Sequence, residues 1–230
     1  MRLLVYAIID GARVPPPVVG PGARLRTINV GRIAAVVDHR RHPPAPTLRN
    51  IRRYHRTVTA IANAVPAILP ARFGTLVVEE ELSFILRTRE VSLRTALKHV
   101  RGRVQMTARV PNRSGELPPG TEAHEAPDLE GGSKSGRSGS DGPGTRYLRN
   151  RVSPEDRETR RLLTPLRRSV QGWVHDEQVL DRAGVTSVYH LVSRRSAATY
   201  ARALRAAAQK AGLDIVVSGP FPPYAFAAAM

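Results

Sequence analysis

A composition break between Pro111 and Gly144 constrains the fold of this chain more than any other feature. The segment consists mainly of Gly, Ser, Pro, Asp and Glu, and it contains the run GGSKSGRSGS. Such a stretch offers almost no large apolar side chains to offset the entropy lost on ordering. More than about thirty structureless residues are improbable inside one compact domain. We therefore expect an acidic, disordered linker or insertion at 111–143, between an N-terminal domain, 1–110, and a C-terminal domain, 144–230.

The N-terminal block alternates between extended and helical patterns. Apolar residues recur at spacings of three and four between Thr47 and Val65, which indicates an amphipathic helix. Glu79 to Glu81 opens a second helix near the positive end of its dipole, and Ser92 is expected to cap a third. Strands are predicted at 2–9, 28–38 and 104–110, and one short extended region covers 67–69 and 76–78. The order ββαβααβ predicts an α+β sandwich with its helices on one face of a sheet.

The C-terminal block shows the same kinds of element. Ser153 and Pro154, followed by two acidic residues, are typical of a helix start. A strand at 185–192, an alanine-rich helix at 196–211 and a last strand at 213–217 follow. The fold class expected for the whole chain is therefore α+β, as two small domains, the second a helix-on-sheet unit.

The charge of the chain is strongly basic, at +17 from 36 basic and 19 acidic residues. A basic chain suggests an anionic partner, and a nucleic-acid-binding module is the alternative function that this feature favours. Only three of the basic residues are lysines, and the linker has a net negative charge. The excess of arginine, with abundant Ala, Gly and Pro, is also what a GC-rich coding sequence produces. We therefore rank nucleic-acid binding as the second reading.

Residues for catalysis are scarce. The chain has no cysteine, which excludes thiol nucleophiles and thiolate zinc sites and fits a cytoplasmic location. His175, followed by two acids, is interpreted as a surface histidine beside a turn, and His190 as a packing residue within a strand. The apolar run Leu3–Ile9 is too short to cross a bilayer. We expect no enzyme activity, cofactor, metal or membrane contact.

Three short segments are more specific than the rest. In the first, a glycine follows Arg72 and Phe73, and the arginine side chain can fork onto a carboxylate or onto carbonyls. The second, GTRYLRNR, begins at Gly144. The third, SGPFPPYAF at 218–226, combines stiff prolines with three of the eleven aromatic residues. Such a tail either docks on its own domain or presents its rings to a partner, and we favour docking.

Together and in this order, the segments resemble the gas vesicle GvpL/GvpF family. The family pattern of an apolar strand with a tyrosine matches Leu3 to Ile8, and the leucine-proline-x-arginine-phenylalanine-glycine-threonine motif matches Leu69 to Thr75. The glycine-x-x-tyrosine-leucine motif matches Gly144 to Leu148, and the Gly/Pro/aromatic tail matches Gly219 to Phe226. Phe221 stands where the family usually has tryptophan.

The resemblance implies a non-enzymatic accessory protein that helps to assemble gas vesicles and is located at the vesicle in the cytoplasm. Its implied partners are the small hydrophobic shell protein and other accessory proteins. Its implied fold is two α+β domains, the first a modified ferredoxin-like unit. The residues expected to bind a partner or to form structural motifs are Arg72, Phe73, Gly74, Tyr147, Gly219, Pro220, Phe221, Pro222, Pro223, Tyr224 and Phe226.

Overall fold

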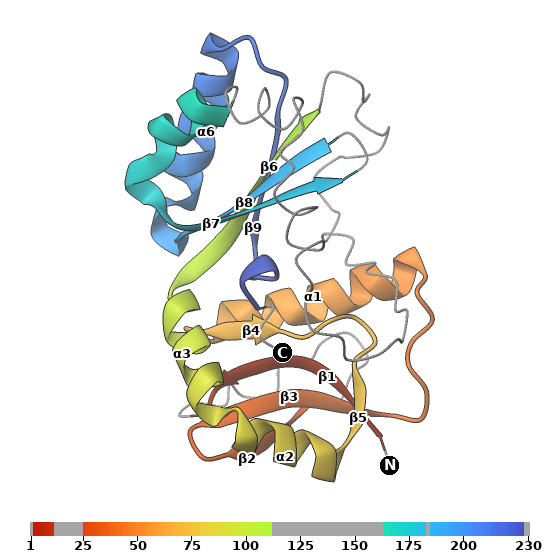
Figure 1. The fold of residues 1–230 in the computed structure, drawn as a ribbon. Coiled ribbons are helices and arrows are strands. Elements are labelled where there is room, and N and C mark those ends of the chain that lie inside the picture. The colour runs from red at the N-terminus through yellow and green to blue at the C-terminus, as the bar shows by residue number, and fades with distance from the viewer. Residues whose placement is uncertain (1, 12–24, 112–162, 183–184, 228–230) are drawn as a thin grey trace, which may run out of the picture.

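The computed structural model describes residues 2–11, 25–111, 163–182 and 185–227, and two antiparallel sheets with helices make up this part of the chain (Figure 1). The mixed α+β class expected from the sequence is confirmed. The segment 112–143, Tyr147 and the helix start at 153–156 lie outside the described residues. None of the described helices is long and apolar enough to cross a membrane.

The first sheet is built around one almost fully buried strand, β1 (Arg2–Asp10). β1 pairs with β3 (Ile33–Arg40) on one side and with two short strands, β4 (Ile68–Pro70) and β5 (Leu76–Val78), on the other. β2 (Arg26–Val30) completes the sheet at the outer edge of β3. Because both faces of β1 are covered, its sequence is a continuous apolar run rather than an alternating one.

Helices cover both faces of the first sheet, whereas the sequence predicted helices on one face only. Leu4, Tyr6 and Ile9 of β1 pack with Tyr54 and other residues of α1 (Leu48–Ala64). The intervening side chains of β1 pack instead with α2 (Glu79–Thr88) and α3 (Glu90–Val100). Successive residues of a strand point to opposite faces, so each face needs its own apolar cover.

Two local predictions in this region were wrong. The expected single strand at 28–38 is a hairpin, because Gly31 adopts φ +55° between β2 and β3. A β-carbon at Gly31 would lie only 2.5 Å from Glu90 Oε1, so a larger residue there would have to displace the end of that side chain. Ser92 is not a helix cap: α3 begins at Glu90, and the Ser92 hydroxyl donates to the Arg89 carbonyl inside the first turn.

The second sheet has the strand order β7-β8-β6-β9. β6 (Arg103–Pro111) was expected to close the N-terminal block, but it pairs with β8 (Val185–Ser193) and β9 (Val216–Phe221). A left-handed turn at Gly102, with φ +68°, follows α3 and leads the chain into the second sheet. Alternation along β6 indicates a strand, but not which sheet it joins, because that depends on residues about eighty positions away.

One strand of the second sheet was missed and another was shifted. β7 (Val174–Arg182) forms the edge of the sheet and pairs with β8, although its sequence VHDEQVLDR lacks the alternation of a half-buried strand. β9 begins at Val216 and runs to Phe221, later than the predicted strand at 213–217. The predicted helix at 196–211 is confirmed as α6 (Ala197–Lys210).

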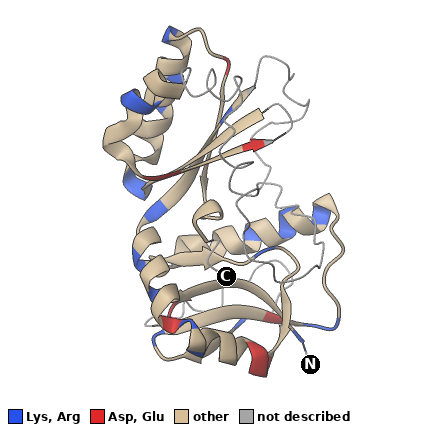
Figure 2. Cartoon of the chain, in the orientation of Figure 1, with Lys and Arg blue, Asp and Glu red and all other residues tan. Residues whose placement is uncertain are grey.

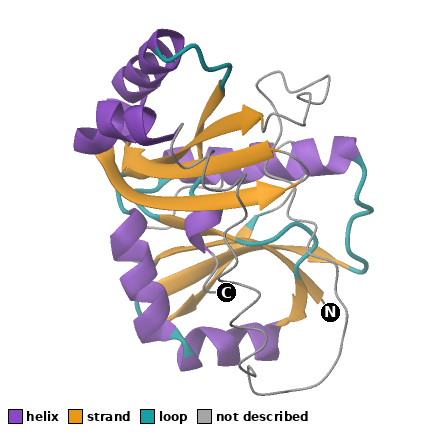
Figure 3. Cartoon of the chain, turned by 45° about the horizontal axis from the view of Figure 1, so that its top comes forward, coloured by secondary structure: helices purple, strands orange, loops and turns teal. Residues whose placement is uncertain are grey.

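The second sheet also has cover on both faces (Figure 3). α6 and the helix at 163–170 pack on one face, where Tyr200 and Leu204 are buried against alternate residues of β6 and β8. On the opposite face, Tyr189 and Leu191 of β8 belong to the same core cluster as α2 and α3. The two sheets therefore share a continuous core in addition to the chain connection through β6.

Candidate functional site

The C-terminal tail begins in a bulge of β9. Opposite Met106 of β6, the pairing shifts register where Gly219 and Pro220 are inserted, joined by a cis peptide bond. Gly219 has φ +116°, and a β-carbon there would lie 2.8 Å from the Gln105 carbonyl oxygen. The tail motif therefore requires glycine at this position for both conformation and space.

Beyond the bulge, the tail packs on its own chain. Phe221, Pro222 and Pro223 are buried, and the Tyr224 hydroxyl lies 2.9 Å from Nδ1 of His55 on α1. The chain then turns through η3 (Ala225–Ala227), where Phe226 enters the core cluster shared by the two sheets. Burial raises the pKa of Tyr224, so its phenol stays protonated and available for hydrogen bonding.

Gln105 is a tail anchor that the sequence analysis did not identify. It is fully buried in β6, and its Oε1 accepts a hydrogen bond of 2.8 Å from the Ala225 backbone N–H. Its Nε2 lies 3.4 Å from Oγ1 of Thr107, which is also buried. Gln105 and Thr107 alternate with apolar residues and share their face of β6 with Arg103 and Arg109, a pattern typical of a solvent-exposed face, so no sequence signal marked Gln105 as buried.

Replacing Gln105 with leucine is expected to lower the free energy of unfolding by about 1–2 kcal/mol, because the Ala225 N–H then stays buried without an acceptor. Chemical denaturation measures the loss, and hydrogen exchange should show faster exchange at Ala225 than in the wild type. Leucine at Thr95, an exposed position on α3, serves as a control for an added apolar side chain. An unchanged exchange rate at Ala225 would show that Gln105 does not hold the tail.

The turn at Arg72, Phe73 and Gly74 is positioned by Tyr54 of α1. The Tyr54 hydroxyl lies 3.0 Å from the Ala71 carbonyl and 3.3 Å from that of Arg72. The Phe73 ring meets the Tyr54 ring edge-on, with the centroids 5.4 Å apart. Gly74 has φ +81°, which explains the glycine of the motif.

The turn and the tail pack against the same core cluster, which the sequence did not predict. Phe73 and Tyr224 both pack against the core cluster between α1 and the first sheet. Gly219 and Pro220 lie further away, against β6 of the second sheet. Arg72 is exposed, and its guanidinium makes no ion pair with any residue that the structure describes. The two motifs thus form a joint between the sheets, with one unpaired cation at its rim.

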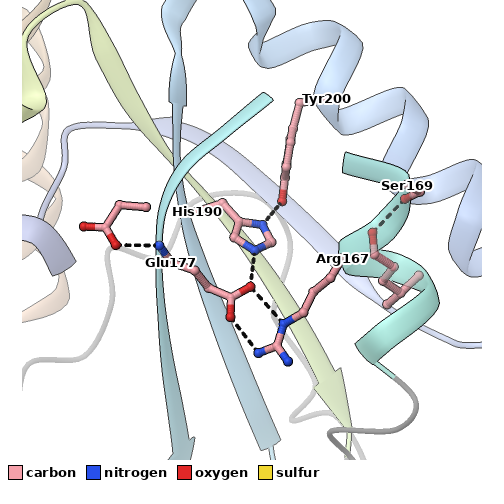
Figure 4. Close-up of polar contacts among 7 residues, drawn as sticks. Arg167, Ser169, Glu177, His190 and Tyr200 are labelled. Atoms are coloured by element: carbon pink, nitrogen blue, oxygen red, sulfur yellow. Dashed lines mark hydrogen bonds and ion pairs between the residues drawn. The ribbon is translucent and has the colours of Figure 1, made fainter. Parts of the chain in front are cut away.

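A second polar cluster connects β7, β8, α6 and the helix at 163–170 (Figure 4). Arg167 donates to both carboxylate oxygens of Glu177, at 3.0 and 2.6 Å. His190 Nε2 lies 2.7 Å from Glu177 Oε2, and its Nδ1 lies 2.5 Å from the Tyr200 hydroxyl. The hydrogen bond with His190, with help from Arg167, lowers the pKa of Glu177 to about 2.

The geometry of this cluster suits a structural tie. Tyr200 is completely buried, and His190, which is 3% exposed, lines a cavity of about 360 Å³ together with Arg167 and Glu177. Burial raises the pKa of Tyr200, which keeps the phenol neutral. Both oxygens of the carboxylate are already occupied, and no group of three or more metal-ligand side chains occurs in the described ranges. The cluster joins the edge strand to the helices.

His175 itself is exposed, as expected, near the start of β7 and two residues after the 3-10 turn η1 (Gln171–Trp173). Its acidic neighbours have other partners, because Asp176 pairs with His99 at 2.9 Å and Glu177 with the cluster above. His190 is buried within β8, and its polar cross-strand contact was not foreseen.

A cavity of about 560 Å³ lies beside the joint, between the first sheet, α2, α3 and the β7 edge. We call it the β7 groove. Its walls are mainly apolar, and two arginines, Arg72 and Arg89, are its only charged residues in the part of the chain that the structure describes. The remaining residues that line it are Val5, Ile8, Pro70, Ala71, Thr75, Val77, Leu82, Ile85, Leu93, Gln178, Val179, Leu180, Tyr189, Tyr224, Ala225 and Ala227.

Two gas vesicle proteins are among the solved structures that match this chain over almost its whole length. The gas vesicle protein GvpF from Microcystis aeruginosa superposes with a TM-score of 0.71 at 14% identity, with 98% of each chain covered. GvpF from Anabaena sp. PCC7120 superposes with a TM-score of 0.67 at 15% identity, again with 98% of each chain covered. At these identities the likeness establishes a shared fold.

Comparison at the level of sequence identifies the family. A search among curated proteins finds no match. The sequence model described as "Gas vesicle synthesis protein GvpL/GvpF" matches residues 2–228. This match includes both the turn and the tail that the structure brings together. The chain therefore belongs to the GvpL/GvpF family of gas vesicle synthesis proteins.

Proposed function

We propose that this chain is a non-enzymatic accessory protein that binds the gas vesicle shell protein, and other accessory proteins, while the vesicle is assembled. Family membership implies a role in gas vesicle formation. The observation that supports direct binding of the shell protein is the β7 groove, an apolar cavity of about 560 Å³. A cavity of this size with mainly apolar walls is suited to apolar side chains from another molecule.

The physical need for such a binder follows from the chemistry of the shell protein. A small hydrophobic protein exposes apolar surface until it joins the growing wall, and exposed apolar surface drives aggregation. A protein that covers part of this surface reversibly keeps the subunit available for assembly. In this proposal the turn at Arg72 to Gly74 and the tail brace the binding surface, and the protein acts at the vesicle.

Deletion of the gene in its host tests the proposal. We expect cells without the chain to lose gas vesicles, as counted by electron microscopy, and an episomal wild-type copy to restore them. Shell protein in the deleted strain should move from the soluble fraction to the pellet. Normal vesicle numbers after deletion, with the shell protein still soluble, would contradict the proposed role.

The rival function, nucleic-acid binding, is favoured by one observation. α1 carries Arg49, Arg52, Arg53 and Arg56 on its exposed surface, without an acidic residue in the helix (Figure 2). Counterion release then predicts affinity for random duplex DNA that falls by a factor of about 10² or more between 50 and 200 mM salt. Filter binding at both salt concentrations separates the two functions, and we expect little retention of duplex even at 50 mM, where the rival predicts strong retention.

A further inference from the structure

The outer edge of β7 is open in the part of the chain that the structure describes. Among the described strands, β7 pairs only with β8 and is the first strand of its sheet. Two apolar side chains of this edge strand are exposed, Val179 at 42% and Leu180 at 38%. A sheet edge with free backbone groups and apolar side chains is a template for another strand, and proteins usually protect such edges.

The same strand forms one wall of the β7 groove. Gln178, Val179 and Leu180 line it from β7, and Ile85 and Leu93 line it from α2 and α3. A strand added to the outer edge of β7 would direct alternate side chains toward opposite faces of the sheet. One set of these side chains is then placed beside the apolar cavity. The open edge and the cavity are therefore parts of one surface.

The charge at the groove is one-sided. Arg72 and Arg89 line it, and no carboxylate does so among the described residues. Neither arginine forms an ion pair with a described residue, whereas Arg26, Arg101 and Arg167 elsewhere in the chain each contact a carboxylate. A guanidinium next to apolar walls favours a ligand carboxylate, which it can hold with two parallel hydrogen bonds.

We propose that the β7 groove binds an extended apolar segment of the shell protein that carries a carboxylate. The segment adds to β7 as a further strand, its alternate apolar side chains enter the cavity, and its acidic side chain pairs with Arg72 or Arg89. Backbone hydrogen bonds supply affinity in this mode of recognition, and the side-chain pockets supply specificity. The assignment rests on the proposed function and names the part of the chain that performs it.

Fluorescence anisotropy with the full chain and labelled ten-residue peptides that tile the shell protein tests the proposal. Each acidic peptide is paired with one in which Asp or Glu is replaced by its amide. We expect one acidic peptide to bind and its amide partner to bind about tenfold more weakly. The Arg72→Gln/Arg89→Gln variant should also lose about tenfold, without a further loss for the amide peptide, because both changes remove one interaction.

Matched variants separate the groove from general effects. Leu180→Lys is expected to weaken the same peptide about tenfold. Arg87→Gln and Phe84→Lys, at exposed positions on α2 outside the groove, should leave binding unchanged. Thermal melting of each variant shows whether a loss of peptide binding is caused by unfolding. Hydrogen exchange should show that the bound peptide slows exchange of β7 backbone amides.

Three results would overturn the proposal. In the first, the intact shell protein binds, but no peptide binds or the groove variants do not weaken binding. This result would leave the proposed function unchanged. The second is binding of decanoate, an apolar carboxylate, without binding of any peptide. The third is strong protection, in the free chain, of the β7 amides that point away from β8. Failure of the intact shell protein to bind the wild-type chain would instead contradict the proposed function itself.

Discussion

Replacement of both Phe221 and Phe226 with alanine is expected to lower the melting temperature by about 15 °C. Both rings are largely buried, Phe221 near His55 of α1 and Phe226 in the core cluster that the two sheets share. Truncation of a buried phenylalanine typically costs about 3–5 kcal/mol, so the pair should cost about 6 kcal/mol. For a chain of this length, each kcal/mol corresponds to about 2–4 °C.

The same variant shows whether the tail braces the binding surface or forms it. Neither ring lines the β7 groove, so capture of shell protein should fall only in proportion to the unfolded fraction. Phe84→Ala is the control, because Phe84 is 69% exposed and its loss should hardly change the melting temperature. Loss of shell-protein capture with an unchanged melting temperature would mean that the two rings contact the partner directly.

Replacement of Glu177 with glutamine is expected to lower the free energy of unfolding by about 2–3 kcal/mol at pH 7. The carboxylate holds Arg167 and His190 together, and glutamine cannot accept the same charge-assisted hydrogen bonds. Loss of one partner of a buried ion pair costs about 3–5 kcal/mol, and we reduce this figure because the Glu177 side chain is 28% exposed. Urea unfolding measures the difference.

The effect of this substitution depends on pH in a defined direction. The folded-state pKa of Glu177 is about 2, below the ordinary value of 4.5. The carboxylate therefore contributes its full stability above about pH 4.5 and loses it as the pH falls toward 2. The difference between wild type and Glu177→Gln should shrink over that window. Glu81→Gln, at an exposed position on α2, should show no such trend, and a constant Glu177→Gln difference would contradict the assignment.

The sequence was sufficient to predict the helices and strands whose apolar pattern lies within the element itself. The helix at 47–65 was found because its apolar residues repeat with the helical period, and the structure has α1 at Leu48–Ala64. β7 was missed because an edge strand with mostly exposed, charged residues has no alternating pattern to detect. β6 was recognised as a strand but assigned to the wrong sheet, because its partners Val185–Ser193 are distant in sequence.

The residues of the candidate site show the same difference between local patterns and long-range contacts. The turn at Arg72 and the tail at Gly219 were visible as rigid Pro/Gly segments with aromatic residues. Their packing against one cluster, and the part that Gln105 and Tyr54 play in holding them, depend on contacts between distant segments. The Glu177–His190–Tyr200 cluster is of the same kind, because its members come from three different elements. A sequence pattern can mark each of these residues separately, but it does not show that they contact one another.

The most direct measurement of the central claim is light scattering of purified shell protein as it is diluted from denaturant into buffer, with and without this chain. We predict that an equimolar amount of the chain suppresses scattering and that the two proteins then elute together from a sizing column. The Leu180→Lys variant should suppress it less than wild type. Equal rates of aggregation with and without the chain, and separate elution of the two proteins, would contradict the account.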